Sequence, residues 1–259
     1  MRSLRSAAAL ALAGLLSLAG VLAGPAPAGA ASPEYVALGD SYSSGTGTSP
    51  YIDLLCTRSS AAYPVLYAAA HPGTSLKFVA CGGATIPDVV SDQLSALSAN
   101  TTLVTLSIGG NDSGFASTML SCQYGTTATC TSALDKGRDF FENQLPGQLD
   151  SLYAQVRARA PQAKVVIVGY PRLFKSGGLC LGGLSAAKRA LLNQAADDMS
   201  EVIAGRAAAA GFAFADARTT FAGHEICTTS PWIDSATVHP NATGHRQGYL
   251  PVVTAAAGA

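Results

Sequence analysis

The sequence predicts an α/β protein in which helices cover both faces of a parallel sheet. Short apolar runs at residues 34–38, 76–80 and 103–108 each lead into a turn that contains glycine, and a stretch with helical spacing precedes the next run. The same alternation continues to residue 215. Strands that alternate with helices pair in parallel, because each helix returns the chain to the same edge of the sheet.

Five strands are expected, and each is a short apolar run bounded by turn residues. They are placed at residues 34–38, 76–80, 103–108, 164–168 and 212–215. In an open parallel sheet, ligands bind beyond the carboxyl ends of the strands. Residues that directly follow these runs are therefore candidates for a functional site.

Helices are expected where apolar residues recur at helical spacing between capping and breaking residues. The first covers residues 61–70, with Ser60 as its cap and His71-Pro72-Gly73 as its stop. Further helices are placed at residues 85–97, at residues 140–159 and at residues 185–210. His245 is interpreted as a structural histidine near the start of the last helix.

Residues 1–30 predict a secretory signal peptide, and residues 31–259 predict a single domain. Arg2 and Arg5 precede an apolar run at residues 7–23, and the small residues Ala28-Gly29-Ala30 follow as a cleavage pattern. A membrane anchor is the alternative, but this run is short and rich in alanine and glycine. We expect a secreted, extracellular protein without a stable membrane anchor.

The charge balance does not favour a polyanionic partner. The chain has 16 basic and 16 acidic residues, and loss of the two signal-peptide arginines leaves 14 against 16. Such a balance gives no electrostatic attraction to nucleic acid or to an anionic membrane. We expect a monomer whose partner is its substrate.

Six cysteines in the predicted mature chain indicate three disulfides, because an even count is typical of exported proteins. Six cysteines allow fifteen connectivities, and the sequence does not choose among them. We expect neighbours in sequence to pair: Cys56 with Cys81, Cys122 with Cys130 and Cys180 with Cys227. Their spacing is not that of a metal site, so neither a metal nor another cofactor is expected.

A nucleophilic serine with its base is the chemistry that the turn residues favour. Ser41 lies in the turn after the first strand, and His239 can take and return a proton near neutral pH. Gly83 offers a backbone N–H and Asn111 a side-chain amide, the kind of donors that an oxyanion needs. Asp40 is interpreted as a cap of the turn.

These residues resemble the blocks of the SGNH hydrolases, also called GDSL lipases and esterases, across nearly the whole predicted mature chain. The matching blocks are Gly39-Asp40-Ser41-Tyr42-Ser43-Ser44-Gly45, Cys81-Gly82-Gly83-Ala84-Thr85, Gly109-Gly110-Asn111-Asp112 and His239-Pro240-Asn241. The resemblance implies a three-layer α/β/α, flavodoxin-like fold with a central parallel five-stranded sheet. It also implies Ser41 as nucleophile and an oxyanion hole from the N–H groups of Ser41 and Gly83 with the Asn111 amide.

The residue that supports His239 is the one departure from the family pattern. The family places an aspartate three residues before the histidine, and Ala236 stands there in this chain. The alternatives are Asp234, five residues before His239, and the backbone carbonyl of Thr237. Some secreted relatives work with a serine–histidine pair and a main-chain oxygen, and we favour that arrangement.

The expected function is hydrolysis of lipid acyl esters through an acyl-enzyme, as in a lipase, an esterase or a phospholipase. The secretion signal and three disulfides resemble the small extracellular lipases and phospholipases of filamentous actinomycetes. Carbohydrate acetyl esters or thioesters are the alternative substrates, and a non-catalytic secreted binding module is a third hypothesis. Five side chains in or near loops are candidates to line an apolar groove: Tyr42, Phe115, Leu173, Phe174 and Trp232.

Overall fold

The computed structural model describes residues 32–181 and 183–258, so the predicted signal peptide at residues 1–30 lies outside the described residues. Five parallel strands form the central sheet in the order β4-β1-β5-β6-β7. Their bounds are β1 Glu34–Gly39, β4 Ser75–Phe78, β5 Thr101–Ser107, β6 Lys164–Val168 and β7 Ala213–Ala215. The predicted fold class and the five strands are confirmed.

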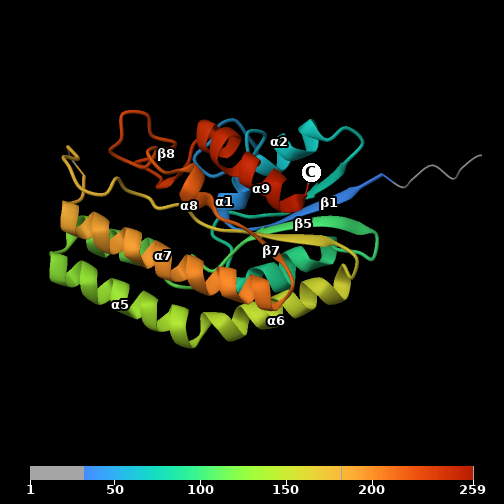
Figure 1. Cartoon of the computed structure of the whole chain (residues 1–259), viewed down its shortest axis with the longest axis horizontal. Helices are drawn as coiled ribbons and strands as arrows, with labels where there is room; N and C mark the ends of the chain where they lie inside the picture. Colours follow the sequence, from blue (N-terminus) through green and yellow to red (C-terminus); the bar gives the residue numbers. More distant parts are fainter. Residues whose placement is uncertain (1–31, 182, 259) are drawn as a thin grey trace, which may run out of the picture. The chain divides into compact units, whose positions relative to one another are not determined.

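Helices cover both faces of this sheet, as Figure 1 shows with α5, α6 and α7 on one side and α2 and α9 on the other. The longer helices are α2 Tyr63–Ala70, α4 Phe115–Tyr124, α5 Thr127–Asn143, α6 Leu145–Arg159, α7 Ala186–Ala209 and α9 Leu250–Ala257. The short ones are α1 Ser41–Ser44, α3 Ile86–Asp88 and α8 Ala217–Thr220. Two small antiparallel pairs lie outside the main sheet: β2 Tyr51–Asp53 with β3 Arg58–Ser59, and β8 Ile233–Asp234 with β9 His239–Pro240.

The register between the two central strands places the site. Leu38 of β1 faces Leu106 of β5, and Gly39 faces Ser107, so both strands end at the same level. A side chain on Gly39 would lie 2.6 Å from the carbonyl oxygen of Ser107, a distance that no Cβ atom tolerates. Only glycine therefore allows the Ser41 turn to leave the sheet so close to the neighbouring strand.

Two predicted helix boundaries are wrong. The helix predicted at residues 140–159 is two helices, α5 and α6, that meet at Gln144. Pro146 separates them, because proline has no N–H and its ring clashes with the carbonyl four residues earlier. Ser60 does not cap α2, which starts at Tyr63 after the N-cap residue Ala62 and has Pro64 in its first turn, a position that proline favours.

The predicted helix at residues 85–97 is helical but irregular. After α3 the chain widens into a π-helical turn, η1 Val89–Gln93, and then tightens into a 3-10 turn, η2 Leu94–Ala96. Gln93 at the end of the wide turn accepts a hydrogen bond from the N–H of Gly39 at 2.7 Å and donates one to its carbonyl at 2.9 Å. The irregular turn thus supports the strand end that precedes Ser41.

The three disulfides join Cys56 to Cys81, Cys122 to Cys130 and Cys180 to Cys227. This is the pairing of neighbours in sequence. The first holds the β2–β3 segment against the end of β4, the second joins α4 to α5, and the third anchors the loop between β6 and α7. Each bridge therefore fixes a segment that follows or precedes an element of the main sheet.

Candidate active site

Ser41 is held at the start of a helical turn directly after β1. The Asp40 carboxylate caps this turn by accepting a hydrogen bond from the Tyr42 N–H at 3.0 Å, which confirms its predicted capping role. The N–H of Ser41 itself has no acceptor among the described residues, whereas the next three N–H groups bond to Asp40. Its side chain lines a cavity at the carboxyl edge of the sheet.

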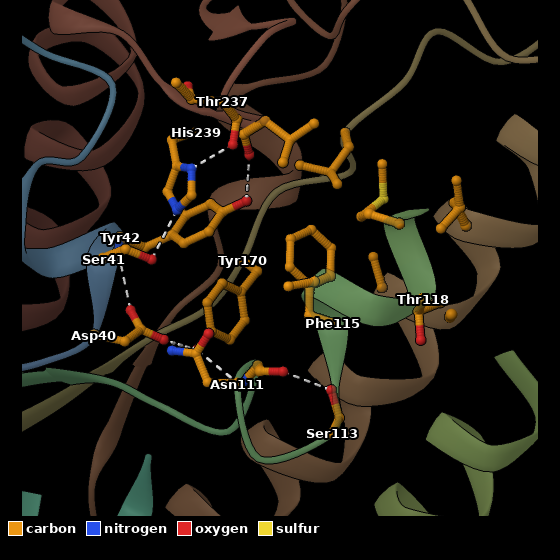
Figure 2. Close-up of a pocket in the computed structure, with 18 of the residues that line it drawn as sticks. Asp40, Ser41, Tyr42, Asn111, Ser113, Phe115, Thr118, Tyr170, Thr237 and His239 are labelled. Atoms are coloured by element: carbon orange, nitrogen blue, oxygen red, sulfur yellow. Dashed lines mark hydrogen bonds between the residues drawn. The ribbon is translucent and has the colours of Figure 1, made fainter. Parts of the chain in front are cut away.

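His239 lies against Ser41, although 198 residues separate them in the chain. Its Nε2 is 2.7 Å from the Ser41 hydroxyl oxygen, and its Nδ1 is 2.6 Å from the carbonyl oxygen of Thr237 (Figure 2). A carbonyl oxygen can only accept, so the proton of the neutral imidazole is on Nδ1. Nε2 is then an acceptor for the serine hydroxyl, the arrangement that a general base requires.

The loop that carries His239 contains a residue with a strained backbone conformation. Val238, between Thr237 and His239, has a φ of +55°, which is rare for a β-branched residue. Its carbonyl accepts a hydrogen bond from the Tyr42 hydroxyl at 2.7 Å, and the Tyr42 ring lies 4.8 Å from the imidazole. The residue after the serine therefore positions the loop that carries the histidine.

Asp234 supports this loop from the other side. Its Oδ1 accepts hydrogen bonds from the N–H groups of Ala236 at 3.1 Å and Thr237 at 2.8 Å, and from the Thr237 hydroxyl at 2.9 Å. Within the described chain none of its hydrogen bonds goes to His239. These donors hold the pKa of Asp234 below its usual value, with a smaller contribution from the nearby imidazole.

Gly83 and Asn111 lie on the turns after β4 and β5, and both line the same cavity as Ser41. Gly83 has a φ of +82°, and no atom lies within 4 Å of the position that its Cβ would take. The Gly82 N–H is engaged by the carbonyl of Cys56 at 2.9 Å, which leaves Gly83 as the available donor of this block. Asn111 donates one amide hydrogen to the Ala84 carbonyl at 2.9 Å, so its orientation is fixed and its second hydrogen stays available.

Burial shifts the pKa values of two groups at the site, and the shift of His239 favours the neutral imidazole. The pKa of His239 is lowered because burial disfavours the charged ring, against smaller opposing effects of the Thr237 carbonyl and Asp234. Burial raises the pKa of Asp40 to about 6, although Tyr170, Ser107 and the Tyr42 N–H all donate to its carboxylate.

Tyr170 joins the serine turn to the asparagine turn, a role that sequence reasoning missed. Its hydroxyl donates to Asp40 and accepts from the Gly110 N–H at 3.3 Å. Its ring packs edge-on against Tyr42 with centroids 4.9 Å apart. Tyr170 follows β6 by two residues, and this position after a third strand was the signal available in the sequence.

A cavity of about 710 Å³ opens beside the serine and extends between α4, α5 and α7. Apolar side chains from these helices line its far part: Phe115, Met119, Leu134, Phe141, Leu192 and Met199. Of the side chains expected to line an apolar groove, Tyr42, Phe115 and Leu173 do so. Phe174 is buried elsewhere, and Trp232 stacks on His224 at 3.6 Å, so these two expectations are wrong.

Two walls of this cavity, α4 and the larger part of α5, escaped the sequence analysis, whereas α7 was predicted. The spacing of Cys130, Leu134 and Phe141 in α5 is helical, and it is the signal that could have revealed the first half of that helix.

His245 is fully buried in a π-helical segment, η3 Gly244–Tyr249, and accepts a hydrogen bond from the Tyr63 N–H at 3.2 Å. No group of three or more metal-ligating side chains occurs in residues 32–181 and 183–258.

A hydroxyl–imidazole pair at the carboxyl edge of a three-layer α/β/α sheet, with amide donors on the neighbouring turns, defines a serine hydrolase. The profile of the GDSL-like Lipase/Acylhydrolase family matches residues 37–247. The chain belongs to this family and is a serine ester hydrolase.

Similar proteins come from actinomycetes. "Lipase" of Streptomyces rimosus is 46% identical over 263 residues, which covers 98% of each chain. The crystal structure of the extracellular lipase from that organism has a TM-score of 0.84 and 48% identity, covering 86% of this chain and 99% of its own. Phospholipase A1 from Streptomyces albidoflavus NA297 has a TM-score of 0.84 and 46% identity, covering 87% of this chain and 100% of its own.

Proposed function

We propose that this chain is a secreted lipase that hydrolyses the acyl esters of lipids, phospholipids included, through an acyl-enzyme on Ser41. The observation that carries the proposal is the hydrogen-bonded Ser41–His239 pair at the end of a deep apolar cavity. A nucleophile alone would suit any ester. A cavity lined by aliphatic and aromatic side chains selects an ester with a long acyl chain.

In the first half-reaction, Ser41 Oγ attacks the acyl carbonyl carbon while His239 Nε2 takes the hydroxyl proton. The carbonyl oxygen becomes an oxyanion and accepts hydrogen bonds from the N–H groups of Ser41 and Gly83 and from the Asn111 amide. Collapse of this intermediate breaks the bond to the alcohol, which leaves with the proton from His239. Water then repeats both steps, releasing the fatty acid and free Ser41.

The third role belongs to the Thr237 carbonyl. It accepts the Nδ1–H of His239 at 2.6 Å, which fixes the tautomer and stabilises the imidazolium that forms during attack. Asp234 acts on the loop rather than on the ring, since its hydrogen bonds go to residues 236 and 237. This arrangement replaces the carboxylate of the usual triad by a peptide dipole.

The proposal also covers where the protein acts and what it binds. Residues 1–30 are removed as a signal peptide, and residues 31–259 act outside the cell as a monomeric domain. Three disulfides within the described chain support an oxidising compartment. No helix among residues 32–181 and 183–258 is long and apolar enough to cross a bilayer. Nucleic acid is not a partner, because no excess of basic residues exists.

Labelling and a chain-length series test the proposal together. A fluorophosphonate probe should label the folded protein and not Ser41→Ala, and hydrolysis of nitrophenyl esters should favour long acyl chains over acetyl. A probe that leaves Ser41 unmodified in folded protein would instead support a non-catalytic binding module. Preference for acetyl groups would refute the lipid substrate while leaving the nucleophile in place.

A further inference from the structure

Exposed apolar side chains gather beside the disulfides. Within the part of the chain that the structure describes, every strongly exposed large hydrophobic side chain lies within four residues of a disulfide cysteine. We define the apolar rim by six of them: Leu54, Leu55, Leu120, Tyr124, Leu179 and Leu181. Leu55 is 95% exposed and Leu181 is 86% exposed, so these side chains do not contribute to the core.

Two of the three rim segments adjoin the mouth of the catalytic cavity. Leu120 and Tyr124 on α4 line both the cavity and the surface. Leu54 and Leu55 lead through Cys56 into Thr57, which lines the cavity on the side of Gly83. The carbonyl of Cys56 also accepts the Gly82 N–H at 2.9 Å, which ties this segment to the turn beside Ser41.

The third segment, with Leu179 and Leu181, leads into the start of α7, which is held against the end of α4. Lys188 in the first turn of α7 donates to the carbonyls of Cys122 at 2.8 Å and Gly125 at 2.7 Å. In Figure 1 the loop that leads from β6 into α7, yellow to orange, lies at the end of the domain where β1 finishes. All three segments therefore lie at the carboxyl edge of the sheet, where the cavity opens.

The leucine-bearing loop has an internal support. The buried guanidinium of Arg189 donates to the carbonyls of Gly177 and Gly178 at 2.7 Å each and to those of Lys175 and Leu184. Arg189 therefore fixes the backbone on both sides of Leu179 and Leu181, at residues 175–178 and at Leu184. Exposed apolar side chains that gather in this way are typical of a surface that contacts a partner or a lipid.

The charge of the rim indicates which surface it fits. Residues 115–126 contain no charged residue, Asp53 in the first segment pairs with Arg58, and the third segment has the exposed Lys175 beside Gly178. An anionic surface would be favoured by lysine or arginine around the leucines, and these segments lack such a cluster. The one exposed lysine in these segments is not the basic cluster that an anionic surface attracts, so the apolar rim suits the zwitterionic surface of a phosphatidylcholine bilayer.

We propose that the apolar rim is an interfacial docking surface, by which the enzyme seats the mouth of its cavity on a zwitterionic phospholipid bilayer. The leucines enter the headgroup region, and a phospholipid acyl chain then passes from the bilayer into the cavity without crossing water. The inference rests on the proposed lipid substrate and adds how the enzyme reaches it. The disulfides have a second role in this arrangement, since they fix the three segments around the mouth.

Vesicle partitioning tests the docking surface without turnover. In a Ser41→Ala background, the protein should co-sediment with phosphatidylcholine vesicles. Leu54→Ser/Leu55→Ser should weaken partitioning at least about tenfold, and adding Leu179→Ser/Leu181→Ser should weaken it further. The matched control is Gln162→Leu, which adds a leucine in the exposed turn before β6, at the opposite edge of the sheet, and should not change partitioning.

Kinetics with Ser41 intact separate docking from catalysis. The four-serine variant should hydrolyse a monomeric short-chain phosphatidylcholine within about twofold of the parent, because the four side chains are exposed and do not line the cavity. Its hydrolysis of vesicles should fall with its partitioning. Unchanged partitioning in the four-serine variant overturns the docking surface, whereas a parent that leaves monomeric phosphatidylcholine intact overturns the proposed phospholipid substrate. If the parent is a dimer in the absence of lipid and the four substitutions dissociate it, the apolar rim is an interface between two copies of the chain. That result would also overturn the docking surface.

Discussion

The sharpest test of the catalytic geometry is the removal of the charge on Asp234. Asp234→Asn keeps an oxygen that can accept from the Thr237 N–H, now at 2.8 Å, and removes only the negative charge. If the Thr237 carbonyl is the partner of His239, the substitution leaves the ring, its tautomer and its 2.6 Å hydrogen bond in place. The effect is then limited to the loss of a through-space attraction.

The magnitude follows from the position of this charge. A half-exposed carboxylate interacts with a nearby cation by about 0.2–1 kcal/mol, which corresponds to at most about fivefold in rate. Loss of a carboxylate that holds the histidine directly would cost on the order of 10⁴ in kcat. Asp234→Ala should cost more than Asp234→Asn, because it also leaves three loop donors without their acceptor.

The assay is kcat/KM on a soluble short-chain nitrophenyl ester for these two variants, with His239→Ala as reference. The expected order of loss is Asp234→Asn, then Asp234→Ala, then His239→Ala. Near-equal losses in Asp234→Asn and His239→Ala would refute the carbonyl assignment. Circular dichroism of each variant excludes unfolding as the cause.

Four further predictions concern stability, pH, cavity and metal. Tyr170→Phe removes a hydrogen-bond partner from the buried Asp40 carboxylate and from the Gly110 N–H. The free energy of unfolding, measured by urea denaturation, should therefore fall by about 1–3 kcal/mol. An unchanged midpoint would contradict the role of this hydroxyl. Burial lowers the pKa of His245 to about 3 from 6.5, so its contribution to stability is present above pH 6.5 and is lost, by about 5 kcal/mol, as the pH falls toward 3. Asp40, raised from 3.8 to about 6, acts in the opposite direction by about 3 kcal/mol and offsets His245 between these values, so the two groups together destabilise the fold by about 2 kcal/mol near pH 3, and a fold more stable at pH 3 than at pH 7 would oppose it. Met199→Trp should fill the far part of the cavity and reduce long-chain ester hydrolysis at least about tenfold while short-chain hydrolysis persists, and a parallel loss on both would place the acyl chain elsewhere. Excess chelator should leave activity unchanged, and activity that is lost and then restored by added metal would overturn the metal-independent mechanism.

The lowered pKa of His239 adds an expectation for catalysis that is distinct from stability. The base must be neutral, and burial moves its protonation to a lower pH than that of a free histidine. The acidic limb of kcat/KM should therefore lie below the ordinary value near 6.5. Measurement between pH 4 and pH 8 on the short-chain ester would show it, and a limb above that value would contradict the assigned cause.

Local pattern was enough for the parts of the site that depend on strand ends. Ser41, Gly83 and Asn111 each follow a short apolar strand, and parallel pairing brings such positions to one edge whatever the details of packing. The capping role of Asp40 is equally local, since it depends on the N–H two residues later. The strand positions and the fold class could be predicted for the same reason.

Contacts distant in sequence decided the rest, because no local spacing encodes them. The partner of His239 is a carbonyl exposed by the left-handed φ of Val238, and that conformation depends on the Tyr42 hydroxyl 196 residues away. The apolar cavity exists only where α4, α5 and α7 meet, and the break before α6 was hidden in a continuous helical pattern. The sequence by itself therefore predicted the fold and the pairing of Ser41 with His239, whereas the tertiary structure decided which carbonyl contacts the imidazole, which helices line the cavity and which leucines are exposed.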